Sequence, residues 1–188
     1  KGRIDRYTSY RLGAHRTCET VEATHADGAA LRRLIREQIS GQVSQIFLDY
    51  EHDDVEDLVV IGYEIQLLAP FLTKGSSPKT NIKSLQSFGS ELAEIPEEER
   101  VQRYQVDYHT ADAVVPALET NLAIAEVFKL QSLRIPVSDY ERGIHIDLPR
   151  SPSFITGFRA EVIRSARILA QKFKVDAKHA GQVAKLAK

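Results

Sequence analysis

The sequence predicts an α/β domain followed by the beginning of an all-α domain. Residues 58–61 form a run of four apolar residues, which is typical of a buried strand. Gly62 interrupts this run before a helical pattern begins. Helices with aliphatic stripes are expected on either side of the strand, as in a sheet covered by helices. Beyond residue 153 the pattern is purely helical.

The composition is that of an ordinary globular protein. Of its 188 residues, 43% are hydrophobic and 27% are charged, so general disorder is not expected. The 25 basic and 26 acidic side chains nearly cancel, which removes the electrostatic argument for a DNA partner. No apolar run approaches the roughly 20 residues that span a bilayer, so no membrane segment is expected.

Cys18 is the only cysteine of the chain. An intrachain disulfide and a multi-cysteine zinc site are therefore both excluded, and a reducing cytoplasm is the natural compartment. We expect Cys18 to be a small packed side chain. The chain contains no methionine, and its first residues have the composition of a strand, so we expect it to be an internal piece of a longer protein.

The first fifty residues are expected to form strands around one helix. The composition of residues 4–21 favours one long or two short antiparallel strands, with a bulge at Gly13. Asp27 can cap a helix whose apolar stripe includes Leu34 and Ile39, with arginines on its solvated faces. Residues 45–50 are expected to begin another short strand.

The segment from residue 55 to residue 72 is the candidate functional element. Its strand ends at Gly62, and a helix limited or kinked by Pro70 follows. A glycine turn between a strand and a helix can direct backbone N–H groups and a helix N-terminus toward an anion. A plain strand-to-helix turn of an α/β domain is the other interpretation, because one glycine is a weak signal.

The following part of the chain is predicted to contain three helices and a strand. Asn81 or Thr80 can cap the first helix, Pro96 and three glutamates start the second, and Thr110 can cap the third and longest. Residues 133–137 are predicted to form a strand, and residues 138–143 a turn.

Two prolines and two serines near residue 150 predict a domain boundary. We assign residues 1–148 to the α/β domain, residues 149–153 to a linker and residues 154–188 to the helical domain. Asp176 can cap a second helix within the helical domain.

Four motifs, in this order, carry a resemblance to a known family. They are Tyr10-Arg11-Leu12-Gly13-Ala14-His15-Arg16; Val59-Val60-Ile61-Gly62-Tyr63-Glu64; the run formed by Glu98-Glu99-Arg100, Thr110-Ala111-Asp112-Ala113-Val114-Val115-Pro116-Ala117 and Ile135-Pro136-Val137-Ser138-Asp139-Tyr140 with Arg142-Gly143; and Asp176-Ala177-Lys178-His179-Ala180-Gly181-Gln182-Val183-Ala184-Lys185-Leu186-Ala187. The chain resembles the second half of the catalytic core of the exopolyphosphatase / guanosine pentaphosphate phosphohydrolase family, followed by the start of its helical C-terminal domain.

The resemblance implies a ribonuclease-H-like domain of the actin and sugar-kinase superfamily, with a mixed sheet and flanking helices. It implies that the parent chain hydrolyses a phosphoanhydride of inorganic polyphosphate or of guanosine pentaphosphate, with magnesium as cofactor. This chain would contribute one wall of the phosphate-binding cleft, through Gly62, Tyr63, Glu64 and Arg16. The catalytic glutamate would lie in an upstream domain, so the chain holds no catalytic residue and is not expected to be active alone. A homodimer is also implied.

The chain departs from the family pattern at the turn itself. Tyr63 and Glu64 stand where the family has a second glycine and a threonine. A carboxylate and a bulky ring at this position oppose the close approach of an anion. The second hypothesis is therefore a degenerate homologue that binds a nucleotide or an anion without hydrolysing it. His52 and His179 could be drawn as metal ligands, but a polar loop and a capped or packed helix explain them.

Overall fold

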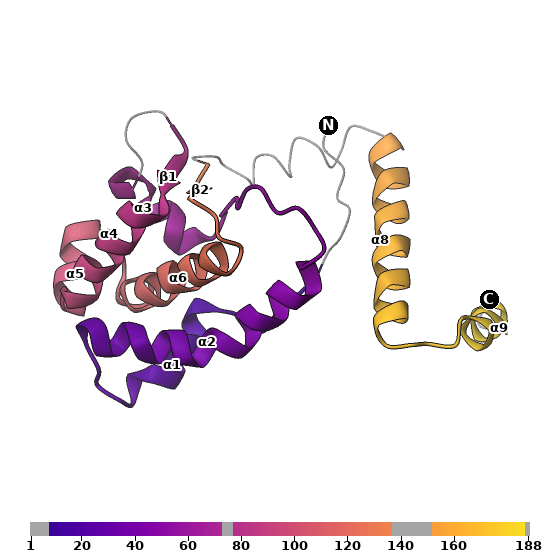
Figure 1. Cartoon of the computed structure of the whole chain (residues 1–188), viewed down its shortest axis with the longest axis horizontal. Coiled ribbons are helices and arrows are strands. Elements are labelled where there is room, and N and C mark those ends of the chain that lie inside the picture. The colour runs from indigo at the N-terminus through magenta and orange to yellow at the C-terminus, as the bar shows by residue number, and fades with distance from the viewer. Residues whose placement is uncertain (1–7, 73–76, 137–151, 187–188) are drawn as a thin grey trace. The chain divides into compact units, whose positions relative to one another are not determined.

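The structure, a computed structural model, describes residues 8–72, 77–136 and 152–186. The chain divides into two compact units (Figure 1). One unit is Tyr10–Ser138, and the other combines Lys1–Ser9 with Asp139–Lys188. Of the predicted linker 149–153, only Pro152 and Ser153 belong to the described residues, and they begin a helix.

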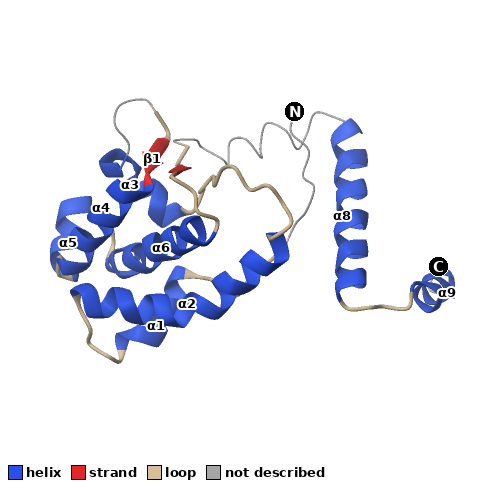
Figure 2. Cartoon of the chain, in the orientation of Figure 1, coloured by secondary structure: helices blue, strands red, loops and turns tan. Residues whose placement is uncertain are grey.

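Most described residues are helical (Figure 2). The helices of the first unit are α1 Ala14–Glu22, α2 Gly28–Tyr50, α3 Tyr63–Leu72, α4 Ile82–Glu94, α5 Glu97–Tyr104 and α6 Tyr108–Val127. Its strands are β1 Lys79–Asn81 and β2 Ser132–Arg134. The second unit contains α8 Pro152–Lys172 and α9 Ala177–Leu186. No helix among the described residues combines the length and the apolarity needed to cross a membrane.

Helix α6 is the centre of the first unit, and helices α1 to α5 all pack against it. It is apolar on nearly every side, which is the pattern of a helix enclosed by other elements. Five of its twenty residues are alanines, whose small side chains let the neighbouring helices approach closely. Its fully buried side chains include Ala111, Ala113, Val114, Val115, Leu118, Leu122 and Ala125.

A small mixed sheet closes one side of this core. β1 and β2 are antiparallel, with Thr80 opposite Leu133. On the other side of β2, the segment 58–60 runs parallel to it through a single bridge between Val59 and Arg134. The Val60 N–H donates to the Arg134 oxygen at 2.8 Å, and the Arg134 N–H donates to the Leu58 oxygen at 2.8 Å. The predicted strand at 58–61 is thus present only as this bridge.

Local signals at the helix starts are largely confirmed. The Asn81 side chain accepts a hydrogen bond from the Lys83 N–H, and Asp176 accepts from the N–H groups of Lys178 and His179. At α6 the prediction was wrong, because Asp107 rather than Thr110 is the N-cap. The N–H and the hydroxyl of Thr110 both donate to the Asp107 carboxylate, which satisfies the open end of the helix.

The strands predicted before residue 50 are wrong where the structure describes them. Residues 14–22 form α1, in which Thr17 and Val21 are buried one helical turn apart. Gly13 is the N-cap of this helix rather than a bulge, and residues 4–7 lie outside the described residues. Residues 45–50 complete α2, whose buried residues include Val43 and Ile46. Packing against α6 has overridden the β-type composition of these segments.

The arginines of α2 are not all solvated, as the sequence had suggested. Glu119 of α6 is fully buried and accepts from Arg32 Nε at 2.6 Å and from Arg36 Nε at 2.5 Å. Arg36 Nη1 also donates to Glu126 at 2.5 Å. Burial alone would raise the pKa of Glu126, but the hydrogen bonds from Arg36 and Gln86 bring it below its ordinary value. These ion pairs lock α2 onto the central helix.

Replacing Glu119 with alanine should destabilise the chain by about 3 kcal/mol, because two half-buried arginines lose their carboxylate and a cavity remains. Urea unfolding followed by circular dichroism measures this difference. The control is Glu37→Ala, which removes the exposed pair between Glu37 and Arg33 and should change stability by no more than about 0.5 kcal/mol. Equal effects of the two substitutions would contradict the role assigned to Glu119.

Candidate functional site

The Gly62 turn leads directly into α3. The Gly62 oxygen accepts a hydrogen bond from the Gln66 N–H at 3.0 Å, which closes the first helical turn. A cavity of about 400 Å³ lies beside the turn. The residues that line it are mainly apolar. They come from residues 10–14 at the start of α1, from the segment before α3 and from helices α2 and α6: Tyr10, Leu12, Ala14, Ile46, Val59, Val60, Ile61, Ala117 and Ile124.

Two of the four predicted site residues meet at this cavity, and two do not. Gly62 and Glu64 both line it. The Glu64 carboxylate folds back over the turn, so that Oε2 lies 3.9 Å from the place of a Cβ on Gly62. Tyr63 is 61% exposed and is not part of the cavity wall. Arg16 is exposed on α1 and does not line the cavity either.

Glu64 contacts a pair of stacked histidines that the sequence did not single out. His15 Nε2 of α1 lies 3.3 Å from Glu64 Oε1. The His15 ring stacks on that of His109 at the start of α6, with centroids 3.9 Å apart and planes inclined by 7°. Three helix starts therefore meet at the turn. His15 lies within the family-like motif 10–16, whereas no local signal marks His109 as its partner.

The described residues alone do not form a magnesium site. No group of three His, Cys, Asp or Glu side chains in the described ranges could hold a metal ion. Parallel imidazole rings direct their nitrogen lone pairs along separate planes, so the stacked pair cannot share one ion. Glu64 is the single carboxylate among the side chains that line the cavity. One carboxylate can hold magnesium only together with water and the phosphate oxygens of a substrate, so the described side chains alone do not form the site.

Two polar groups of α6 complete the cavity wall. The Asn121 amide donates to the Ala117 oxygen of its own helix at 2.8 Å. Thr120 Oγ1 is buried and has no hydrogen-bond partner among the described residues. A buried hydroxyl without a hydrogen-bond partner lowers the stability of the folded state. The cavity wall contains no lysine or arginine, so the described side chains do not attract a polyanion here.

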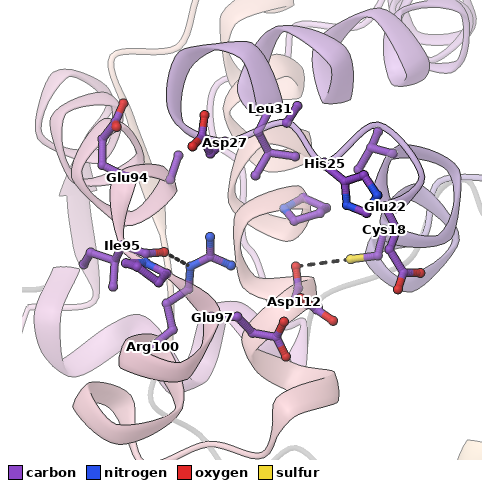
Figure 3. A pocket seen from close by; sticks show the side chains of 15 residues that line it. Cys18, Glu22, His25, Asp27, Leu31, Glu94, Ile95, Glu97, Arg100 and Asp112 are labelled. Carbon is purple, nitrogen blue, oxygen red and sulfur yellow. Dashed lines mark hydrogen bonds between the residues drawn. The ribbon is translucent and has the colours of Figure 1, made fainter.

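A second cavity, of about 340 Å³, lies elsewhere in the first unit (Figure 3). The residues around it come from α1, the starts of α2 and α5, the end of α4 and α6. Arg100 reaches into it beside Glu97 and Asp112, and His25 and Asp27 lie across from them (Figure 3). The sequence motifs Glu98-Glu99-Arg100 and Thr110-Ala111-Asp112 thus meet in space.

Arg100 ties three helices together. It is 7% exposed, and its Nε donates to the oxygens of Leu92 and Ile95 at the end of α4. Its Nη1 donates to the Ala111 oxygen of α6 at 3.1 Å. Burial lowers its pKa, and the charges of Asp112 and Glu97 oppose this shift. Burial and the neighbouring Asp112 raise the pKa of Glu97. We assign Arg100 a structural role, because its guanidinium satisfies carbonyls that the helix ends leave open.

Comparison with known proteins supports the family resemblance through structure rather than sequence. No protein-family model and no curated protein matches the chain. The crystal structure of the type II variant of the Aquifex aeolicus Ppx/GppA phosphatase matches with a TM-score of 0.59 and 19% identity, over 76% of this chain and 49% of that one. The chain shares its fold with the Ppx/GppA phosphatases. A crystal structure of the Aquifex aeolicus member of the Ppx/GppA family matches with a TM-score of 0.61 and 18% identity, over 77% of this chain and 50% of that one.

The resemblance that the sequence motifs predicted is confirmed at the level of the fold. The described residues are mostly helical with a two-stranded sheet, so the larger mixed sheet expected from the resemblance stays a prediction. The chain spans about half the length of the two Ppx/GppA structures. An identity of 18–19% supports a shared fold and does not by itself support a shared chemistry.

Cys18 should be nearly inert toward thiol reagents in the folded chain. Burial, and to a smaller extent the charge of Asp112, raise the pKa of the thiol to about 12. The Cys18 thiol donates a hydrogen bond to the backbone oxygen of Asp112 at 3.2 Å. At pH 8 its reaction with iodoacetamide should be on the order of 10³-fold slower than in the urea-unfolded chain, because the thiolate is the nucleophile. Mass spectrometry of the labelled chain measures both rates. Similar rates would contradict the packing assigned to α1.

Proposed function

We propose that this chain is part of a phosphoanhydride hydrolase that acts on inorganic polyphosphate or guanosine pentaphosphate, and that it contributes one wall of the phosphate-binding cleft. The observation that carries the proposal is the glycine turn at the start of α3, next to a cavity, in a fold shared with Ppx/GppA phosphatases. Backbone N–H groups at a helix start can hold phosphoryl oxygens, and the helix dipole favours their charge.

The proposed division of labour leaves the chemical step to another part of the protein. A carboxylate of an upstream domain would activate water for attack on the terminal phosphorus. In this chain Gly62 would hold the phosphate end at the turn. The resemblance implies magnesium, but the described residues alone do not form a site for it, so we assign it no step here. We also propose a homodimer in the cytoplasm and a ribonuclease-H-like domain, with a larger mixed sheet, over residues 1–148.

A second candidate function is a binding or regulatory homologue without turnover. The contact between Glu64 and His15 supports it, because this carboxylate occupies the space over the turn that a phosphate would need. An anion at Gly62 would have to displace Glu64 or lie against it. The two candidates differ in what they require upstream, since turnover needs a general base and binding does not.

Phosphate release by the full-length protein distinguishes the two functions. With magnesium present, the hydrolase should release phosphate from polyphosphate or from guanosine pentaphosphate, and this chain alone should release none because it lacks the base. A colorimetric phosphate assay measures release, and calorimetry measures binding. Binding without release from either substrate would exclude the hydrolase and leave the regulatory homologue.

Replacing Glu64 with glutamine should strengthen the binding of phosphate-containing ligands about fivefold at low salt. The reason is the loss of a negative charge at the anion position, which is worth about 1 kcal/mol for a partly exposed pair. Calorimetric titration of the full-length protein with tripolyphosphate measures the change. Glu91→Gln removes an exposed charge on α4 and serves as the control. If both variants bind as the parent does, phosphate does not approach the Gly62 turn.

A further inference from the structure

The cavity beside Arg100 contains a buried charge whose hydrogen bonds the fold uses only in part. The Nε and Nη1 atoms of Arg100 donate to backbone oxygens at the end of α4 and in α6. Its Nη2 has no hydrogen-bond partner among the described residues, and no described carboxylate forms an ion pair with the guanidinium. The guanidinium points into the cavity (Figure 3). A buried donor in this position favours a ligand that brings an acceptor to it.

Two carboxylates line the cavity at the start of α2. Asp27 is the N-cap residue of this helix, but its side chain makes no capping hydrogen bond. Gly28 has a φ of +48°, and a Cβ at this position would overlap the Glu94 carboxylate, so glycine is the residue that fits here. Within the described ranges neither carboxylate has an ion-pair partner. Two negative charges held together in this way favour a cationic group between them.

The overall charge of the lining excludes a purely anionic ligand. Glu97 and Asp112 lie next to the Arg100 guanidinium (Figure 3), and the lining contains five acidic side chains and one arginine. A phosphate or a simple carboxylate would therefore meet net repulsion. A ligand that offers a carboxylate to Arg100 and an ammonium group to Asp27 and Glu94 gains at both places. The charges thus favour a small zwitterion.

Much of the remaining cavity wall is apolar. Its apolar residues are Val21, Leu31, Ala93, Ile95, Pro96 and Pro116. The volume of about 340 Å³ lies at the lower end of the range of small-molecule sites, roughly 300–1,000 Å³. An aliphatic group of a ligand would lose its contact with water against such a wall. The ligand that fits is therefore small and combines a zwitterionic part with an aliphatic part.

We propose that this cavity binds a free aliphatic α-amino acid, whose carboxylate accepts a hydrogen bond from Arg100 Nη2 and whose ammonium group donates to Asp27 and Glu94. An amine without a carboxylate would leave Nη2 open, and a carboxylic acid without an amine would add uncompensated negative charge. The cavity shares no lining residue with the cavity beside the Gly62 turn. The inference therefore does not depend on phosphate hydrolysis.

Calorimetric titration of the full-length protein with three matched probes tests the proposal. L-leucine carries both charged groups, isopentylamine is the same molecule without the carboxylate, and isocaproate is the same molecule without the ammonium group. L-leucine should bind at least about tenfold more tightly than either of the other two, because only it forms charge-assisted hydrogen bonds at both places. No binding of L-leucine at millimolar concentration, or equally tight binding of isopentylamine or isocaproate, would overturn the proposal.

Substitutions at the start of α2 test whether L-leucine binds in this cavity. Asp27→Asn removes the charge but keeps a residue type that suits a helix N-cap, so the protein should stay folded. This variant and Glu94→Gln should each weaken the binding of L-leucine about tenfold. Glu98→Gln, on α5 outside the lining, is the control and should leave binding unchanged.

Unchanged binding of L-leucine in both Asp27→Asn and Glu94→Gln would overturn the proposal, because the ammonium group would then lie elsewhere. A loss of binding in Glu98→Gln as large as in these two variants would also overturn it. Phosphate release is not the readout, so a failure here is distinguishable from a failure of the hydrolase assignment.

Discussion

The burial of α6 is the constraint on which the rest of the first unit depends. A helix that is apolar on nearly every side must be enclosed, and five helices surround it. Its single buried carboxylate, Glu119, then requires cations from a neighbour, and α2 supplies Arg32 and Arg36. Arg100 of α5 bonds both the end of α4 and the same central helix. The starts of α1, α3 and α6, which converge at Gly62, are placed by this packing.

The candidate site combines a backbone turn that suits an anion with a side chain that opposes one. The turn at Gly62 has the form that suits an anion, whereas Glu64 places negative charge over it and His15 holds that charge in place. The cavity beside it is lined mainly by apolar side chains, and none of the described residues that line it is basic. Phosphate recognition at this place would therefore depend on the backbone of the turn.

The sequence predicted those features that depend on a few neighbouring residues. The caps at Asn81 and Asp176 and the helix start at Pro96 follow from local chemistry, and the structure confirms them. It could not predict the partners of Arg32 and Arg36, since Glu119 is distant in the chain, nor the stacking of His15 on His109. Residues 14–22 have β-branched residues that are typical of a strand. They form a helix because they pack against α6, which is distant in the sequence.

The position of β2 has a consequence for biosynthesis. This strand is the last element of the first unit, and it lies between β1 and the segment 58–60, which make no pairs with each other. Neither pairing can form until residue 134 has left the ribosome, so helices α1 to α6 are synthesised before either pairing exists. During that interval the apolar run at 58–61 lacks its pairing with β2, which leaves it open to aggregation.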